Sequence, residues 1–359
     1  MCIAIWSSTN QLGYKLILAS NRDEFLSRPS LPAHWHSFEP IQHHLQTLQA
    51  NPTTNLNTTH GIQDNHQEHP ILSGRDSIAG GTWLGINQQT GKYGFLTNVT
   101  PQLDHIVHNK EEEMGNPAQN CPTPASRGLI IQEFLQSKEG VESYIANLKS
   151  SRTSQDMNGY NLVIGQVGKN GGDGEDRIGF FCNRDPQGMD TLSGTISNLH
   201  PGPSESTLVH GVSNGIACQA PIWPKVTRGI DSMQDCLSKI GEATNSRQTG
   251  SNNLEMELFN LLSQTDDSTD EIPCNILIRP HHRVASPDTP HSLKTWYGTR
   301  TQTILLISQT TPAQITLVER DAFQIQLLTA DSSEPNLGIP IWMGDDPSRW
   351  RRFDFQSPS

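Results

Sequence analysis

The chain has 359 residues, with 25 lysines and arginines against 37 aspartates and glutamates, so its formal net charge is −12. An acidic chain whose one basic cluster is RWRR at 349–352 lacks the basic surface of a nucleic-acid-binding protein and the polybasic patch of a protein that binds anionic membranes. Its start has no signal-peptide pattern and no segment approaches the roughly 18 apolar residues of a membrane span, so we expect a cytoplasmic protein.

The first predicted element is a β-hairpin at the start of the chain. The segments CIAIW and YKLILAS are apolar and β-prone, and the polar residues between them are typical of a turn. A turn centred near residues 10–11 would place Cys2 opposite Ala19 or Ser20. The polar segment NRDE at 21–24 would then leave the sheet at the end where Cys2 lies, so the two stretches form one candidate site.

The rest of the chain alternates groups of strands with groups of helices. The expected elements, in chain order, are strands at 80–86 and 92–98, helices at 126–135 and 141–148, strands at 160–165, 177–183 and 206–214, helices at 223–243 and 253–264, and strands at 298–308 and 315–323. This order lacks parallel βαβ alternation, so it favours an α+β class with layered antiparallel sheets. We expect a single domain over 1–359.

Polar segments interrupt this pattern and lower the hydrophobic content to 33%, where nearly half is usual. Residues 36–70 and 104–125 are polar and aperiodic, so we expect disordered insertions there and an irregular tail after residue 335. Half of the fourteen histidines lie between 34 and 69, but without metal-ligand spacing. No nucleotide-binding glycine motif occurs, so we expect no metal and no other cofactor.

The cysteines are scattered through the chain without a CxxC pair, which is typical of free thiols in a reducing compartment. They are Cys2, Cys121, Cys182, Cys218, Cys236 and Cys274.

Cys2 is the candidate nucleophile. Removal of the initiator methionine is favoured when the second residue is small, so the mature chain would begin with Cys2. An α-amine has a pKa of about 7.7–8.0 and a thiol about 8.5, so one residue could supply both base and nucleophile near neutrality. The alternative is that Cys2 is a small apolar residue that begins a buried strand.

Arg22 and Asp23 are its candidate partners. Arg22 could lower the pKa of the Cys2 thiol or hold a substrate carboxylate, and Asp23 could orient the α-amine. Adjacent residues of a strand point to opposite faces, so at most one of the two should point at Cys2 unless the chain has already turned, and Arg22 is the expected one. The alternative is a strand-ending turn with a surface ion pair, worth at most about 1 kcal/mol.

Five segments, in order, carry a resemblance to a known family. SNRDEFLSRP (20–29), ILSGRDSIAGGTWLGI (71–86), LTN (96–98), HGVSN (210–214) and YGTRTQTILL (297–306) resemble the NRDE-domain family, which includes the transport and Golgi organisation proteins. The resemblance covers most of the chain outside the insertions. It implies a four-layer αββα fold with antiparallel sheets, similar to N-terminal-nucleophile hydrolases such as the choloylglycine and penicillin V acylases.

The resemblance also implies a set of site residues. They are Cys2, Arg22, Asp23, Asn98, Asn214 and Arg300. The cysteine would attack the substrate carbonyl with Arg22 and Asp23 beside it, and one of the two asparagines would donate a hydrogen bond to the oxyanion. Arg300, which enters a strand late in the chain, would complete the polar rim of the site. An asparagine after a strand is also a common turn former, so both interpretations of Asn98 and Asn214 stay open.

Two functions follow from the resemblance. One is a role in Golgi organisation and protein secretion, with hydrolysis of a small amide or thioester by Cys2. The alternative is a non-catalytic protein that handles haem, an acyl chain or a lipid. The expected partners are a small amide, thioester or lipid-like ligand and proteins of the secretory pathway, and the expected location is the cytoplasm, in association with the Golgi. A third possibility is a structural protein whose insertions bind other proteins.

Overall fold

The computed structural model describes residues 2–8, 12–41, 68–100, 126–168, 176–184, 209–217, 220–245, 254–284, 294–326 and 338–358. Within these ranges the chain forms two large antiparallel sheets, a two-stranded sheet and five α-helices. This confirms the predicted mixed α+β class with antiparallel sheets. Within the same ranges, every helix is too short or too polar to cross a membrane.

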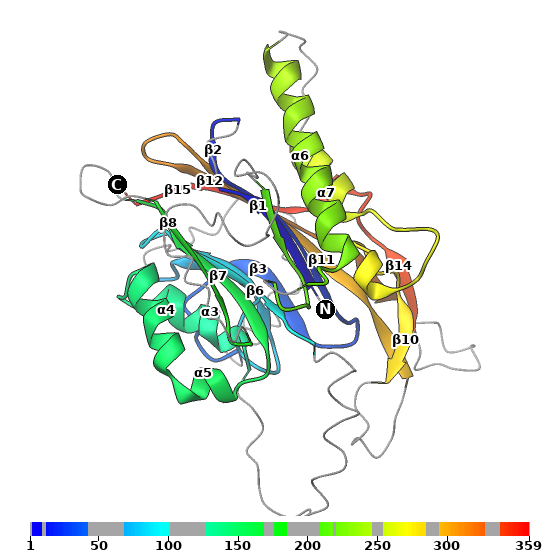
Figure 1. Ribbon diagram of the computed structural model, residues 1–359, viewed down its shortest axis with the longest axis horizontal. Helices are drawn as coiled ribbons and strands as arrows, with labels where there is room; N and C mark the ends of the chain where they lie inside the picture. Colours follow the sequence, from blue (N-terminus) through cyan, green and yellow to red (C-terminus); the bar gives the residue numbers. More distant parts are fainter. Residues whose placement is uncertain are drawn as a thin grey trace, which may run out of the picture.

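The larger sheet contains the two strands of the amino-terminal hairpin among its inner strands (Figure 1). Its strand order is β15-β12-β11-β2-β1-β9, and β10 also pairs with β11. The strands are β1 (Cys2–Ser7), β2 (Tyr14–Phe25), β9 (Val209–Val212), β10 (His281–Val284), β11 (Lys294–Ser308), β12 (Gln314–Asp321) and β15 (Arg351–Gln356).

The smaller sheet follows the order of the chain from β3 to β8. Its strands are β3 (Ser30–His36), β4 (Ile71–Asp76), β5 (Leu84–Asn87), β6 (Lys92–Asn98), β7 (Tyr160–Gln166) and β8 (Arg177–Cys182). A separate pair is formed by β13 (Phe323–Gln326) and β14 (Ile339–Trp342). The helices are α3 (Gly128–Gln136), α4 (Val141–Ser150), α5 (Arg152–Asp156), α6 (Pro224–Asn245) and α7 (Leu254–Leu262), with short 3₁₀ turns at Ile272–Cys274 and Pro347–Arg349.

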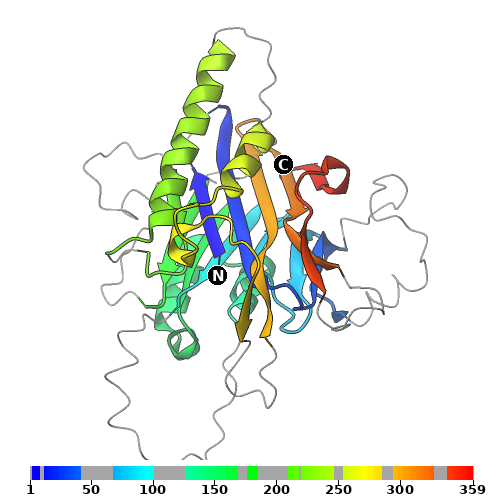
Figure 2. The ribbon, with the colours of Figure 1, turned by 90° about the vertical axis from the view of Figure 1, so that its right-hand side faces the viewer.

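Three apolar cores hold these elements together. The first lies between the two sheets and contains Trp6 and Phe95. The second, which contains Ile5 and Phe259, lies between the larger sheet and α6 and α7. The third contains Phe134 and lies between the smaller sheet and α3 and α4. Figure 1 shows the two helix groups on opposite sides of the molecule, and in Figure 2 the blue strands β1 and β2 run alongside the yellow-green α6.

The continuous apolar run of β1 follows from this position. Successive strand residues point to opposite faces, and in β1 one face meets the inter-sheet core through Ala4 and Trp6 while the other meets α6 and α7 through Ile3 and Ile5. A strand buried on both faces needs apolar residues at every position rather than at every second one. Burial therefore explains why CIAIW lacks the alternation of a surface strand.

The register of the amino-terminal hairpin differs from the sequence expectation. Cys2 pairs with Arg22, and Ser7 pairs with Ile17, so the hairpin is centred on residue 12, midway between 7 and 17, rather than near 10–11. Leu12 (φ 53°) and Gly13 (φ 79°), directly before β2, both adopt left-handed backbone conformations, which glycine adopts readily and leucine rarely. The prediction that Cys2 lies opposite Ala19 or Ser20 was wrong, and the true register brings it closer to the NRDE segment.

Several strands were missed or misassigned from sequence, among them β10 and β14. The segments that form β3 and β4 were not predicted as strands, although they form the outer part of the smaller sheet. The expected irregular tail contains β15, which pairs with β12 through residues 351–356. The expected insertion at 104–125, and that at 36–70 apart from its two ends, lie outside the described residues. The four cysteines within the described ranges are free thiols, as predicted: Cys2, Cys182, Cys236 and Cys274.

Candidate functional site

The candidate site is centred on the first residue of β1. The backbone N–H of Cys2 donates a hydrogen bond of 2.8 Å to Oδ1 of Asn214, which follows the end of β9. Nδ2 of Asn214 donates in turn to the carbonyl oxygen of Asn98 at 2.5 Å. Asn214 is fully buried. Of the two candidate asparagines, Asn214 therefore contributes its side chain beside Cys2, whereas Asn98 contributes its main-chain carbonyl.

A second set of bonds fixes the turn that carries Asn214. Ser213 Oγ donates to the Cys2 carbonyl at 2.7 Å, and Thr97 Oγ1 donates to the Ser213 carbonyl at 2.5 Å. Asn161, a fully buried residue of β7, donates from Nδ2 to the carbonyls of Ser213 at 2.9 Å and Gly215 at 2.8 Å. These bonds connect β1 and β9 of the larger sheet to β6 and β7 of the smaller one. The position of Asn214 is thus determined by both sheets.

The Cys2 thiol lies in a mixed electrostatic environment. Burial raises its pKa, and the charge of Asp23 acts in the same direction. The chain's amino group, a hydrogen bond from the backbone N–H of Asp23 and the charge of Arg22 each lower this pKa. The raising effects are larger, so the thiol carries its proton more firmly than a free cysteine does. Such a thiol needs a base close by in order to become a nucleophile.

Arg22 and Asp23 extend from β2 toward different parts of the molecule. The guanidinium of Arg22 lies 4.1 Å from the ring centroid of Trp83, which borders the inter-sheet core, and 3.8 Å from a carboxylate oxygen of Glu24. Oδ1 of Asp23 accepts a hydrogen bond of 2.7 Å from Thr299, and Oδ2 lies 3.9 Å from Nζ of Lys225 on α6. Although the two side chains diverge, both influence the Cys2 thiol.

Arg22 also carries an unsatisfied donor. The side chain is 5% exposed, and within the described residues its Nη1 makes no hydrogen bond. An unpaired buried N–H group costs free energy, commonly about 1–3 kcal/mol, unless a ligand satisfies it. This donor is therefore available to an oxygen atom brought to the site.

Arg300 lies two strands away from Cys2 in the larger sheet. It occupies a bulge of β11 between Thr299 and Thr301, where β11 pairs with Asp23 and Arg22. One guanidinium nitrogen donates to the Arg28 carbonyl. Burial lowers the pKa of Arg300, and the charge of Arg22 acts in the same direction. Arg300 thus adds a second positive charge to the same end of the sheet.

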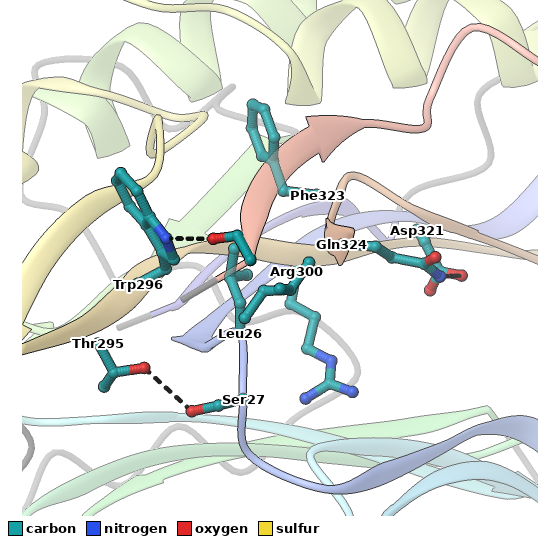
Figure 3. A pocket seen from close by; sticks show the side chains of 10 residues that line it. Leu26, Ser27, Thr295, Trp296, Arg300, Asp321, Phe323 and Gln324 are labelled. Carbon is teal, nitrogen blue, oxygen red and sulfur yellow. Dashed lines mark hydrogen bonds between the residues drawn. The ribbon is translucent and has the colours of Figure 1, made fainter. Parts of the chain in front are cut away.

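A pocket of about 450 Å³ adjoins Arg300 (Figure 3). Its walls include Leu26, Trp296, Phe323 and Ile325, together with Asp321. Asp321 accepts two hydrogen bonds from Arg351, at 3.0 and 3.1 Å, and Arg351 also donates to Glu319. Ser27, Thr295 and Gln324 also line the pocket. The pocket therefore combines apolar and polar side chains with the cationic side chain of Arg300.

Three residues of the site were not found from sequence. Lys225 is fully buried beside Asp23. Arg127, just before α3, donates to the Gly159 carbonyl and interacts electrostatically with Cys2. Asn161 was not predicted as a site residue, although an asparagine between Tyr160 and Leu162 in an apolar run is a signal of a satisfied buried polar group. Within the described ranges, no three His, Cys, Asp or Glu side chains gather as metal ligands.

The chain is similar to known proteins over nearly its whole length. The model of the family described as Transport and Golgi organisation 2 matches residues 1–49 and 56–324, which include all six predicted site residues. A Bos taurus protein named Transport and Golgi organization protein 2 homolog is 25% identical over 369 residues, covering 98% of this chain and 96% of its own. A Mus musculus Transport and Golgi organization 2 homolog is 31% identical over 181 residues, 48% of each chain. An uncharacterized protein of Saccharomyces cerevisiae is 25% identical over 339 residues, 89% of this chain and 91% of its own.

Proposed function

Since the chain belongs to the Transport and Golgi organisation 2 family, we propose that it acts in Golgi organisation and protein secretion through hydrolysis of a small amide or thioester at Cys2. The names of its relatives support the cellular part of this proposal. A cytoplasmic protein associated with the Golgi would meet its partners on the organelle surface. The chemical part is supported by the surroundings of Cys2.

The scaffold is proposed to be that of an N-terminal-nucleophile hydrolase. Two antiparallel sheets share one core, and each outer sheet face packs against helices, in line with a four-layer αββα arrangement. In such a scaffold the first residue of a central strand carries the nucleophile. Cys2 occupies that position in β1, between β2 and β9.

The hydrogen bond between Cys2 and Asn214 is the observation on which the proposal depends most. Removal of Met1 would turn the Cys2 backbone nitrogen into an α-amine, held by Oδ1 of Asn214 at the observed 2.8 Å. An amine fixed next to its own thiol can accept the thiol proton. The buried thiol, whose pKa is raised, thereby gains the base that it needs.

The proposed reaction has two halves. The thiol proton passes to the α-amine while the sulfur attacks the substrate carbonyl carbon, and the carbonyl oxygen becomes an oxyanion. The unpaired Nη1 of Arg22 and the second N–H of Asn214 Nδ2 are the donors that would stabilise it. Collapse breaks the C–N or C–S bond, and the leaving group takes the proton from the amine. Water then hydrolyses the acyl-cysteine, which releases a carboxylic acid and regenerates the thiol.

A second candidate function is binding without turnover, as for a protein that handles haem, an acyl chain or another lipid. The pocket beside Arg300 favours it, because its apolar side chains next to one cationic side chain suit a ligand that has an apolar part and an anionic group. In this function Cys2 would serve as a ligand or a packing residue.

Two measurements on the purified protein test the enzymatic proposal. Mass spectrometry of the intact chain should show loss of Met1, and an electrophilic acyl probe should label the parent at Cys2 but not the Cys2→Ser variant. Retention of Met1, or equal labelling of parent and variant, would refute it. Cells that lack the protein should be rescued by the parent and not by Cys2→Ala. Full rescue by folded Cys2→Ala would favour the binding function.

A further inference from the structure

Lys225 is a buried lysine that the proposed reaction does not use. It lies in the first turn of α6, its side chain is 0% exposed, and its Nζ makes no hydrogen bond within the described residues. Burial lowers its pKa, and the amino-terminal end of a helix also disfavours a positive charge. Buried charged groups are rare unless paired. A lysine is therefore costly at this position, and packing alone does not explain it.

Asp23 is the group that offsets this cost. Its Oδ2 lies 3.9 Å from Nζ of Lys225, and both side chains are 0% exposed. Thr299 holds the other carboxylate oxygen at 2.7 Å. Burial raises the pKa of Asp23, and the charge of Lys225 is the largest influence in the opposite direction. Each charge thus lowers the cost of burying the other.

Asp23 in turn acts on Cys2. Its backbone N–H donates to the Cys2 sulfur, while its carboxylate disfavours the thiolate. The charged and titratable groups facing this pair come from every element around it. They are Arg22 and Glu24 on β2, Arg127 before α3, Lys225 on α6 and Tyr297 on β11. Of these, Lys225 lies 3.9 Å from the Asp23 carboxylate, where its positive charge offsets the negative charge of Asp23, and it also interacts electrostatically with Cys2 itself.

We propose that Lys225 is a positioning residue for Cys2: its positive charge offsets the negative charge of the buried Asp23 carboxylate beside it, so that the Cys2 thiol can lose its proton. That the ionised Cys2 thiol serves in catalysis rests on the proposed function. The coupling among the three residues exists whether or not Met1 is removed, so it can be tested separately.

The test is the pH profile of Cys2 alkylation by iodoacetamide, followed by mass spectrometry of the amino-terminal peptide. Lys225→Met should raise the pH midpoint of Cys2 alkylation by about one pH unit. At a fixed pH below the midpoint, alkylation should then be about tenfold slower. Lys92→Met is the matched control, because Lys92 is also buried but donates to Ser137 on the outer side of the smaller sheet. Its profile should overlay that of the parent.

The Asp23→Asn background shows whether Lys225 acts through Asp23, and it keeps the test decisive if Lys225→Met does not fold. The midpoints of Asp23→Asn and of the Asp23→Asn/Lys225→Met double variant should differ by less than about half a pH unit. A difference of about one pH unit in this background, or a parent-like profile for folded Lys225→Met, would overturn the inference. Absence of acyl-probe labelling in the parent, in contrast, would refute only the proposed hydrolase.

Discussion

The backbone N–H of Cys2 donates a hydrogen bond of 2.8 Å to Oδ1 of Asn214, a residue 212 positions later in the chain. The same side chain donates to the carbonyl of Asn98 at 2.5 Å. The start of β1, the turn after β9 and the end of β6 therefore meet at one point. The two asparagines that the sequence left as alternatives take part in a single arrangement, one through its side chain and the other through its main chain.

Asn214→Ala should lower the rate of acyl-probe labelling at Cys2 by about 10²-fold or more, because it removes the acceptor that holds Cys2 and a proposed oxyanion donor. The matched control is Asn98→Ala, which keeps the carbonyl that Asn214 uses. Labelling kinetics with both folded variants check this. A loss for Asn98→Ala as large as for Asn214→Ala would contradict the assignment of Asn214 as the functional asparagine.

Arg22→Gln should raise the pH midpoint of Cys2 alkylation. The charge of Arg22 lowers the pKa of the thiol, so its removal leaves burial and Asp23 less opposed, and the thiolate fraction falls at any pH below the midpoint. Alkylation there should slow about tenfold for every pH unit by which the midpoint rises. Arg28→Gln is the control, since Arg28 pairs with Asp76 at 2.8 Å. An equal rise of the midpoint in Arg28→Gln and Arg22→Gln would mean that any loss of positive charge has this effect, and it would contradict a specific role of Arg22.

The amino-terminal hairpin was predictable because its two strands are apolar and its turn is polar, and this alone brought Cys2 and the NRDE segment together. The register was not, because composition does not fix the residue on which a polar turn is centred, and the observed pairing sets Cys2 opposite Arg22. Cys2 and Arg22 were candidates from the residues themselves, whereas Asn98, Asn214 and Arg300 were named through family resemblance. Their contacts run between segments far apart in the chain, and strand patterns do not specify which segments meet.

Lys225 illustrates a different limit. In an amphipathic helix a lysine normally marks the solvent face, and nothing in the surrounding sequence distinguishes this one. It is buried because the first turn of α6 lies against the larger sheet near Asp23. β15 was missed for a related reason: the polar residues of RRFDFQ alternate with Phe353 and Phe355, and both rings pack against Trp35 of β3. Tertiary contacts decide both cases.

Glu39→Gln should reduce the loss of stability in acid. Burial alone would raise the pKa of Glu39, but hydrogen bonds from backbone N–H groups and the Ser37 hydroxyl outweigh it and lower the pKa to about 2. A carboxyl with a lowered folded-state pKa stabilises the fold above its unfolded value of about 4.3, and this stability is lost as the pH falls toward 2. Urea midpoints at pH 6 and pH 3 should differ less for Glu39→Gln than for the parent. The exposed Glu257→Gln should behave as the parent does.

Asn161→Leu should destabilise the protein and also slow the chemistry of Cys2. The substitution keeps the branched shape but removes the side-chain donor of the Gly215 carbonyl and one of the two donors of the Ser213 carbonyl, the other being Thr97, and an unsatisfied buried group costs about 1–3 kcal/mol. Because Ser213 in turn bonds the Cys2 carbonyl, the turn that carries Asn214 should lose its fixed position.

Urea unfolding should therefore show a lower midpoint, with a loss of roughly 1–3 kcal/mol for the Gly215 carbonyl. Labelling of Cys2 in the still-folded protein should fall at the same time. Asn260→Ala, at an exposed position of α7, should change neither quantity. A normal labelling rate in a destabilised Asn161→Leu variant would mean that Asn161 supports the fold without positioning Asn214, and the link between the two sheets would then have no part in the site.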